Sequence, residues 1–71
     1  MDLFTRKRIL KFVTDFREKS GTPPTLKDFE LGGFSKTVVE DAVKENILEI
    51  FYVNLTNGSI VKTYKIHFDE S

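Results

Sequence analysis

The 71-residue chain has no net formal charge, seven Phe, two Tyr and no Cys. This length predicts a single domain, residues 1–71, whose small core relies on aromatic side chains, and the lack of Cys excludes disulfides and thiolate metal sites. No apolar run is long enough for a membrane span or a signal peptide, so we expect a cytoplasmic protein without membrane, metal or cofactor.

Charge is unevenly distributed along the chain. Residues 1–19 carry six basic and three acidic side chains, whereas residues 35–53 carry two basic and four acidic ones. The overall balance gives no indication of a nucleic-acid partner. The sequence instead indicates a basic first helix and an acidic third helix.

The first segment, residues 2–19, has the spacing of an amphipathic helix. Apolar residues at i, i+3, i+4 and i+7 form one stripe: Ile9, Phe12, Val13 and Phe16. Asp2 is a suitable N-cap, and Gly21 suits the left-handed position that ends a helix. Asp15 is expected to pair with Lys19 at i+4.

The basic side chains of this helix lie off the apolar stripe or at its border. They are Arg6, Lys7, Arg8 and Lys11. One interpretation is an ordinary solvated helix face. The other is a patch that contacts the phosphates of a nucleic acid.

A turn follows the first helix and leads into a second, short one. Pro23 and Pro24 cannot continue a helix. Thr25 is a good N-cap, and Asp28 three residues later completes the pattern of a capping box. We therefore expect a helix from Thr25 to Leu31, with its apolar side facing the core.

A glycine pair, Gly32-Gly33, predicts a sharp turn, after which Ser35 caps a third helix that runs to about Glu45. Its inward face is expected to consist of Val38, Val39, Ala42 and Val43. With the cap, its exposed positions are the candidate contact residues Ser35, Lys36, Thr37, Glu40, Asp41 and Lys44. Glu and Asp can accept a hydrogen bond from cytosine, and Thr can contact a thymine methyl.

Two strands are predicted at Leu48–Asn54 and Ile60–Phe68, because both segments are rich in β-branched and aromatic residues. Asn57-Gly58 is a strong signal for a two-residue type I′ hairpin turn. That turn predicts one face with Phe51, Val53, Leu55, Ile60, Tyr64 and Ile66. It predicts the other face with Ile50, Tyr52, Val61, Thr63 and Lys65.

The hairpin tip is small and polar. Its candidate contact residues, with one lysine behind them, are Thr56, Asn57, Gly58, Ser59 and Lys62. One interpretation is an ordinary turn. The other is a wing that enters a minor groove or lies along phosphates.

Residues 6–29, RKRILKFVTDFREKSGTPPTLKDF, resemble the start of the DNA-binding domain of LexA-type repressors, in which an apolar helix precedes a Gly-x-Pro-Pro-Ser/Thr turn and a short helix. Residues 36–44, KTVVEDAVK, are similar to the third helix of winged helix-turn-helix domains. The resemblance covers residues 5–53. It implies an α+β fold, three helices followed by a C-terminal β-hairpin wing, in which the third helix reads DNA.

The chain also departs from this family. The third helix is about one turn shorter, and no Arg, Gln or Asn occupies the exposed positions that read bases. The sequence ends at Ser71, so the self-cleaving domain of such repressors is expected to be missing. No peptidase activity is therefore carried over.

The leading interpretation is a small DNA-binding transcriptional regulator of the kind encoded by phages or other mobile elements. It is expected to bind double-stranded DNA, as a homodimer on a two-fold site. The alternative is a protein-interaction module on the same fold, whose acidic third helix faces a basic surface of a polymerase or replication component.

Enzymatic activity is not expected. The only histidine is His67, and the sequence has no nucleophile–histidine–carboxylate set, no Gly-rich phosphate loop and no metal-ligand spacing. We therefore expect no small-molecule substrate.

Overall fold

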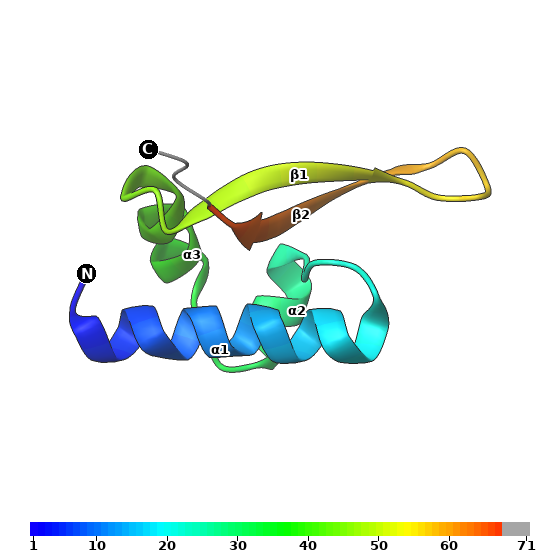
Figure 1. The fold of residues 1–71 in the computed structure, drawn as a ribbon. Helices are drawn as coiled ribbons and strands as arrows, with labels where there is room; N and C mark the ends of the chain where they lie inside the picture. The colour runs from blue at the N-terminus through cyan, green and yellow to red at the C-terminus, as the bar shows by residue number, and fades with distance from the viewer. Residues whose placement is uncertain (68–71) are drawn as a thin grey trace.

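The structure, a computed structural model, describes residues 1–67. The elements in chain order are α1 (Leu3–Ser20), α2 (Leu26–Leu31), α3 (Lys36–Lys44), β1 (Leu48–Asn54) and β2 (Ile60–Ile66). Figure 1 shows α2 and α3 between α1 and the β-hairpin, which extends well beyond the helices. This α+β order is the predicted one and is compatible with a winged helix-turn-helix. Phe68, the predicted end of the second strand, lies outside the described residues.

The helices begin where the capping residues were predicted. The Asp2 carboxylate accepts a hydrogen bond from the Thr5 N–H, which lowers the pKa of Asp2. Thr25 and Asp28 form a complete capping box, in which each side chain accepts a hydrogen bond from the other residue's backbone N–H. Ser35 accepts a hydrogen bond from the Val38 N–H at the start of α3. None of the helices within residues 1–67 has the length and apolar character needed to cross a membrane.

The turns that follow α2 and α3 are of the same kind, and each one returns an apolar residue to the core. After α2, Gly33 is left-handed (φ 95°) and the Phe34 N–H donates to the Phe29 carbonyl. After α3, Asn46 is left-handed (φ 59°) and the Ile47 N–H donates to the carbonyl of Ala42. Glu45, the predicted last residue of the third helix, is its C-cap.

The core lies between α1 and the other elements. Its buried apolar side chains are Ile9, Val13, Phe29, Phe34, Val39, Ala42, Ile47, Leu48 and Tyr64. Phe29 is at its centre, with its ring centroid 5.0 Å from that of Phe12, 5.7 Å from that of Phe34 and 6.0 Å from that of Tyr64. Aromatic rings from α1, α2, the turn before α3 and β2 therefore share one cluster.

Gly32 is packed against this aromatic cluster. A Cβ at Gly32 would lie 2.5 Å from Cε1 of Phe12, whose ring is held by Phe16, Phe29 and Phe34. We expect Gly32→Ala to lower the free energy of unfolding by about 1–3 kcal/mol, because the ring cannot move without disturbing the core. Urea denaturation measures this loss. It should shrink in a Phe12→Leu background, and an equal loss in both backgrounds would contradict the clash.

The predicted strand register is wrong by one residue. Phe51 pairs with Thr63, and Tyr64 pairs with Ile50. A shift of one residue moves every side chain of one strand to the other face, so Phe51 and Val53 share a face with Val61, Thr63 and Lys65. The observed register places Leu48, Tyr64 and Ile66 on one face, against the helical core, whereas the predicted one separates Leu48 from the other two.

The predicted two-residue type I′ turn is also wrong. The Leu55 N–H donates to the Ser59 carbonyl and the Gly58 N–H donates to the Leu55 carbonyl, so the loop has three residues. Gly58 is left-handed (φ 88°), whereas a type I′ turn would require a positive φ at Asn57 as well. Asn57 Oδ1 instead accepts a hydrogen bond from the Ser59 N–H at 2.9 Å.

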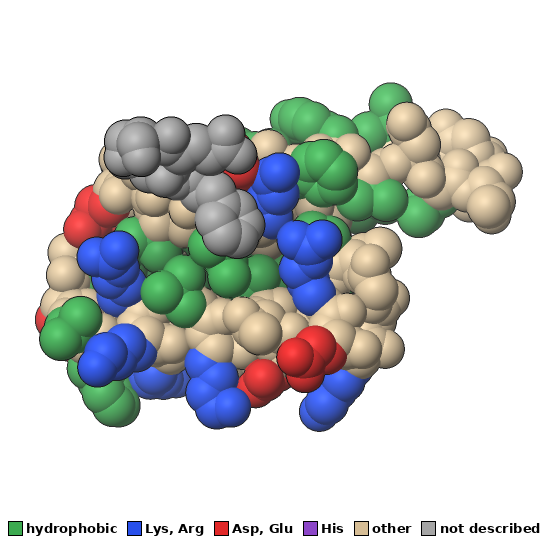
Figure 2. Space-filling model, in the orientation of Figure 1, with side chains coloured by type: hydrophobic (Ala, Val, Ile, Leu, Met, Phe, Trp, Pro, Cys, Tyr) green, Lys and Arg blue, Asp and Glu red, His purple; other side chains and the backbone are tan. Residues whose placement is uncertain are grey.

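The hairpin is anchored at one end. The Tyr64 N–H donates to the Pro24 carbonyl and the His67 N–H donates to that of Ile47, both within 3.0 Å. Beyond Tyr64, the hairpin leaves the helices, and the exposed large apolar side chains of this part are Ile50, Phe51, Tyr52, Leu55 and Ile60. Figure 2 shows hydrophobic surface along this projecting part.

Candidate nucleic-acid interface

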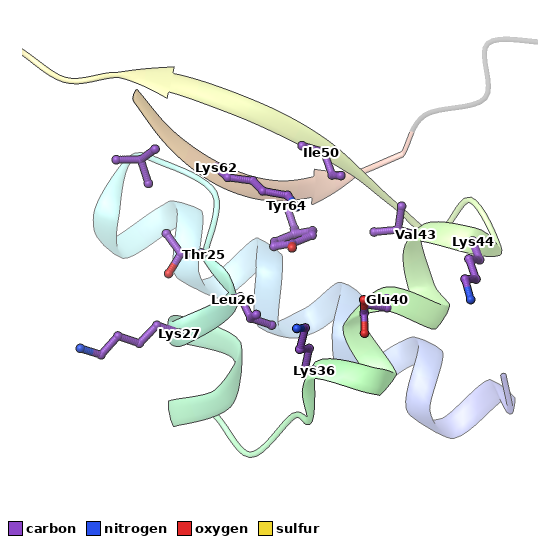
Figure 3. Close-up of a pocket in the computed structure, with 11 residues that line it drawn as sticks. Thr25, Leu26, Lys27, Lys36, Glu40, Val43, Lys44, Ile50, Lys62 and Tyr64 are labelled. Carbon is purple, nitrogen blue, oxygen red and sulfur yellow. The ribbon is translucent and has the colours of Figure 1, made fainter. Parts of the chain in front are cut away.

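A groove of about 650 Å³ lies between the helices and the hairpin. It is lined by Thr25, Leu26, Lys27, Lys36, Glu40, Val43, Lys44, Ile50, Val61, Lys62 and Tyr64. One wall comes from the start of α2, one from the outer face of α3, and one from the hairpin. Figure 3 shows Tyr64 of β2 pointing into the groove from the hairpin, opposite Leu26 of α2 and Glu40 of α3.

Among residues 1–67, four lysines and one glutamate line the groove, which gives it a formal charge of +3, whereas the net charge of the whole chain is zero. Lys36 and Lys44 come from α3, Lys27 from α2 and Lys62 from β2. All four lysines are exposed, and the ammonium of Lys62 lies 5.7 Å from the centre of the Tyr64 ring. Cations from three elements therefore surround one depression, where their fields add.

The floor of the groove is apolar. Leu26, Val43 and Val61 are half-buried, Ile50 is exposed, and Tyr64 is almost completely buried. A ligand in this groove would meet aliphatic and aromatic surface below a rim of lysines. That combination suits a ligand that is anionic at its edges and carries rings or methyl groups.

The structure brings together only part of the predicted third-helix set. Lys36, Glu40 and Lys44 line the groove, whereas Thr37 and Asp41 are exposed on α3 outside it. The Ser35 hydroxyl is used as the N-cap acceptor.

The predicted wing residues are also divided. Lys62 lines the groove, whereas Thr56, Asn57, Gly58 and Ser59 lie at the far end of the hairpin, beyond the helices. The side-chain Oδ1 of Asn57 accepts a hydrogen bond from the Ser59 N–H. The side-chain NH₂ of Asn57 is therefore available to a ligand.

The four basic side chains of α1 that were predicted to contact phosphates, Arg6, Lys7, Arg8 and Lys11, do not line the groove. Lys11 pairs with Asp15 (2.9 Å between Nζ and Oδ2), so the predicted pairing of Asp15 with Lys19 is wrong. The Arg8 guanidinium lies 4.9 Å from the centre of the Phe34 ring and covers one side of the aromatic cluster. Lys7 and Arg6 are exposed. These side chains form a second basic region, separate from the groove.

Sequence reasoning missed Lys27 and the apolar floor of the groove. Lys27 directly follows the capping residue Thr25 and the inward residue Leu26, so the capping box itself fixed its position at the first turn of α2. The sequence predicts Leu26 and Val43 only as inward-facing residues and Tyr64 only as a member of one hairpin face. The partial exposure of Leu26 and Val43 depends on the path of the hairpin, for which the sequence has no local signal.

Comparison of the chain with models of protein families, with curated proteins and with solved structures found no match.

Proposed function

We propose that this chain is a winged helix-turn-helix protein related in architecture to the DNA-binding domain of LexA-type repressors, and that it binds double-stranded DNA as a transcriptional regulator. In this proposal α3 is the recognition helix and the hairpin is the wing. The observation that carries the proposal is the convergence of Lys27, Lys36, Lys44 and Lys62 on one groove of a protein whose net charge is zero.

The arrangement of the groove supports a specific mode of binding. A sugar–phosphate strand that follows the groove is neutralised by lysines from both walls, and the release of its counterions supplies most of the affinity. Lys36 and Lys44 lie on α3, where they can reach base edges as well as phosphates. Thr37 and Asp41 lie outside the groove on the same helix, at positions that can enter a major groove beside the bound strand.

The proposal is tested by titrating the protein with a duplex of random sequence while recording backbone amide NMR shifts. We expect shifts at residues 25–27, 36–44 and 61–64 at low salt, and their reversal at physiological salt. Shifts at the hairpin tip, residues 56–59, would extend the contact to the whole wing. An unchanged spectrum at low salt would overturn the proposal.

Glu40 provides a test of the sign of the ligand's charge. Among residues 1–67 it is the only carboxylate that lines the groove, whereas Asp41 beside it is exposed outside the groove. We expect Glu40→Gln to strengthen DNA binding about fivefold at low salt, since removing one repulsive charge near a phosphate is worth about 1 kcal/mol. Asp41→Asn is the matched control and should change the affinity less. Fluorescence anisotropy measures both, and weaker binding by Glu40→Gln would contradict a polyanionic ligand.

The apolar floor of the groove favours one second candidate, a protein-interaction module. The lysine rim means that such a partner would present an acidic, amphipathic segment, not the basic surface expected from the sequence. Glu45, an acidic residue at the end of α3, accepts a hydrogen bond from the Met1 amino group at 2.8 Å, which raises the pKa of that amine. This candidate would be supported if DNA caused no amide NMR shifts in this protein and an acidic peptide bound to it.

A further inference from the structure

Within residues 1–67, the outer edge of β1 is an unpaired strand edge. The hydrogen-bonding pattern follows from the Leu55–Ser59 pair at the loop and from the Tyr64 N–H, which points away from β1 to Pro24. Residues of β1 therefore alternate, and Ile50, Tyr52 and Asn54 direct their N–H and C=O groups away from β2. Within residues 1–67, no backbone hydrogen bond to these outward groups is present.

This edge lacks the features that usually prevent strands from pairing. Residues 50–54, Ile-Phe-Tyr-Val-Asn, include no charge and no proline, and the pairing with β2 is continuous without a bulge. Soluble proteins generally protect such an edge with lysine, proline, a bulge or a covering segment. Tyr52 is 61% exposed and Phe51 43%, although both are large and apolar.

We propose that a second copy of this chain pairs with this edge, β1 against β1, to form a two-fold dimer with a four-stranded antiparallel sheet in the order β2-β1-β1-β2. In the register centred on Tyr52, Tyr52 faces its own copy and Ile50 faces Asn54. On the opposite face of the sheet, Phe51 lies beside Val53 of the second copy. This pairing joins β-branched and aromatic side chains across the two-fold axis, the combination that stabilises antiparallel pairs.

The distribution of charge is compatible with a second copy as the occupant of this edge. The net charge of the chain is zero, so two copies do not repel each other at long range. The paired segment contains no charged side chain, so no like charges are placed opposite each other. The outer edge of β2 is different: the Tyr64 N–H is already bonded to Pro24, and Lys62 would face Lys62 of a second copy.

The dimer also has a consequence for DNA binding in the groove. This consequence rests on the proposed function, whereas the dimer itself does not. The two-fold axis of an antiparallel strand pair is perpendicular to the sheet. Ile50 and Tyr64, which line the groove, belong to one face of the sheet. Both grooves would therefore open on the same side of the dimer, as binding to a two-fold operator requires.

Sedimentation velocity without DNA tests the dimer. We expect the weight-average mass to rise with concentration from the 8.2 kDa monomer toward twice that value. Amide hydrogen exchange identifies the edge, because the amides of Ile50, Tyr52 and Asn54 should become protected as the concentration rises. A mass that stays at 8.2 kDa at all concentrations overturns the proposal. Protection at the Lys62 amide in place of Tyr52 also overturns it.

Variants make the test specific to the edge. Tyr52→Lys should raise the dimer dissociation constant about fivefold or more, because two lysines would then face each other across the axis. Ile60→Lys is the matched control: Ile60 is equally exposed on the same face but lies in β2. We expect it to leave the dissociation constant unchanged. An equal effect of both variants would contradict pairing through β1. These experiments contain no DNA. An absence of dimerisation is therefore distinguished from an absence of DNA binding.

Discussion

Replacement of Phe29 with alanine is expected to lower the free energy of unfolding by about 3–5 kcal/mol. Phe29 is completely buried, and its ring contacts those of Phe12, Phe34 and Tyr64. The truncation would leave a cavity shared by α1, the turn before α3 and β2, none of which can close it alone. A domain of this size has a small stability margin, so most of the Phe29→Ala protein should be unfolded at 25 °C. Far-ultraviolet circular dichroism in urea measures the change.

Phe4→Ala is the matched control for this prediction. It removes the same ring from a position in α1 that is 69% exposed, so its effect should be within about 0.5 kcal/mol. Phe29→Leu should fall between the two, because leucine fills part of the same space. A Phe29→Ala midpoint close to that of Phe4→Ala would show that the core is not centred on Phe29.

The helical part of the fold could be predicted because its signals are local. A capping box requires only Thr25 and Asp28, three residues apart, and the left-handed end of α1 requires only Gly21. The apolar stripe of α1 follows from the period of 3.6 residues, and two of its members, Ile9 and Val13, are completely buried. These features depend on residues within one or two turns of each other, so they can be recognised without knowledge of the rest of the chain.

The hairpin register could not be predicted in the same way. The Asn57-Gly58 pair is compatible both with a two-residue turn and with a three-residue loop in which only Gly58 is left-handed. The choice depends on which register buries more apolar surface against the helices. Of these two registers, the observed one brings Leu48 of β1 to the same face as Tyr64 and Ile66 of β2. That criterion involves residues distant in sequence, so the local signal was insufficient.

The candidate site was partly predictable for the same reason. The exposed lysines of α3, Lys36 and Lys44, follow from the helical period. Lys27 and Lys62 belong to α2 and β2, and only the path of the chain places them around the same groove. When charges are counted within each segment of the sequence, the segment that contains α3, residues 35–53, is acidic. The groove is nevertheless basic, because its charge is assembled across elements.

The largest effect on DNA binding is expected from reversing one lysine on each wall of the groove. The double variant Lys36→Glu/Lys62→Glu changes the formal charge of the groove from +3 to −1. We expect the dissociation constant for duplex DNA to rise about a hundredfold or more, at roughly 1.4 kcal/mol for each reversed lysine. The slope of log affinity against log salt should fall by about two, since two phosphate contacts are lost. Fluorescence anisotropy at several salt concentrations measures both quantities.

The matched control is Lys7→Glu/Lys19→Glu, which makes the same change in net charge on exposed positions of α1. If the groove holds the phosphates, this control loses only the long-range attraction, which salt screens, and at physiological salt its affinity should approach that of the wild type. An equal loss in both double variants would show that the basic face of α1 is itself a phosphate contact, as the sequence allowed. A loss confined to the α1 variant would move the interface away from α3 and the hairpin altogether. The comparison therefore decides which of the two basic regions meets DNA, and it does so without knowledge of the operator, because phosphate contacts act on every sequence.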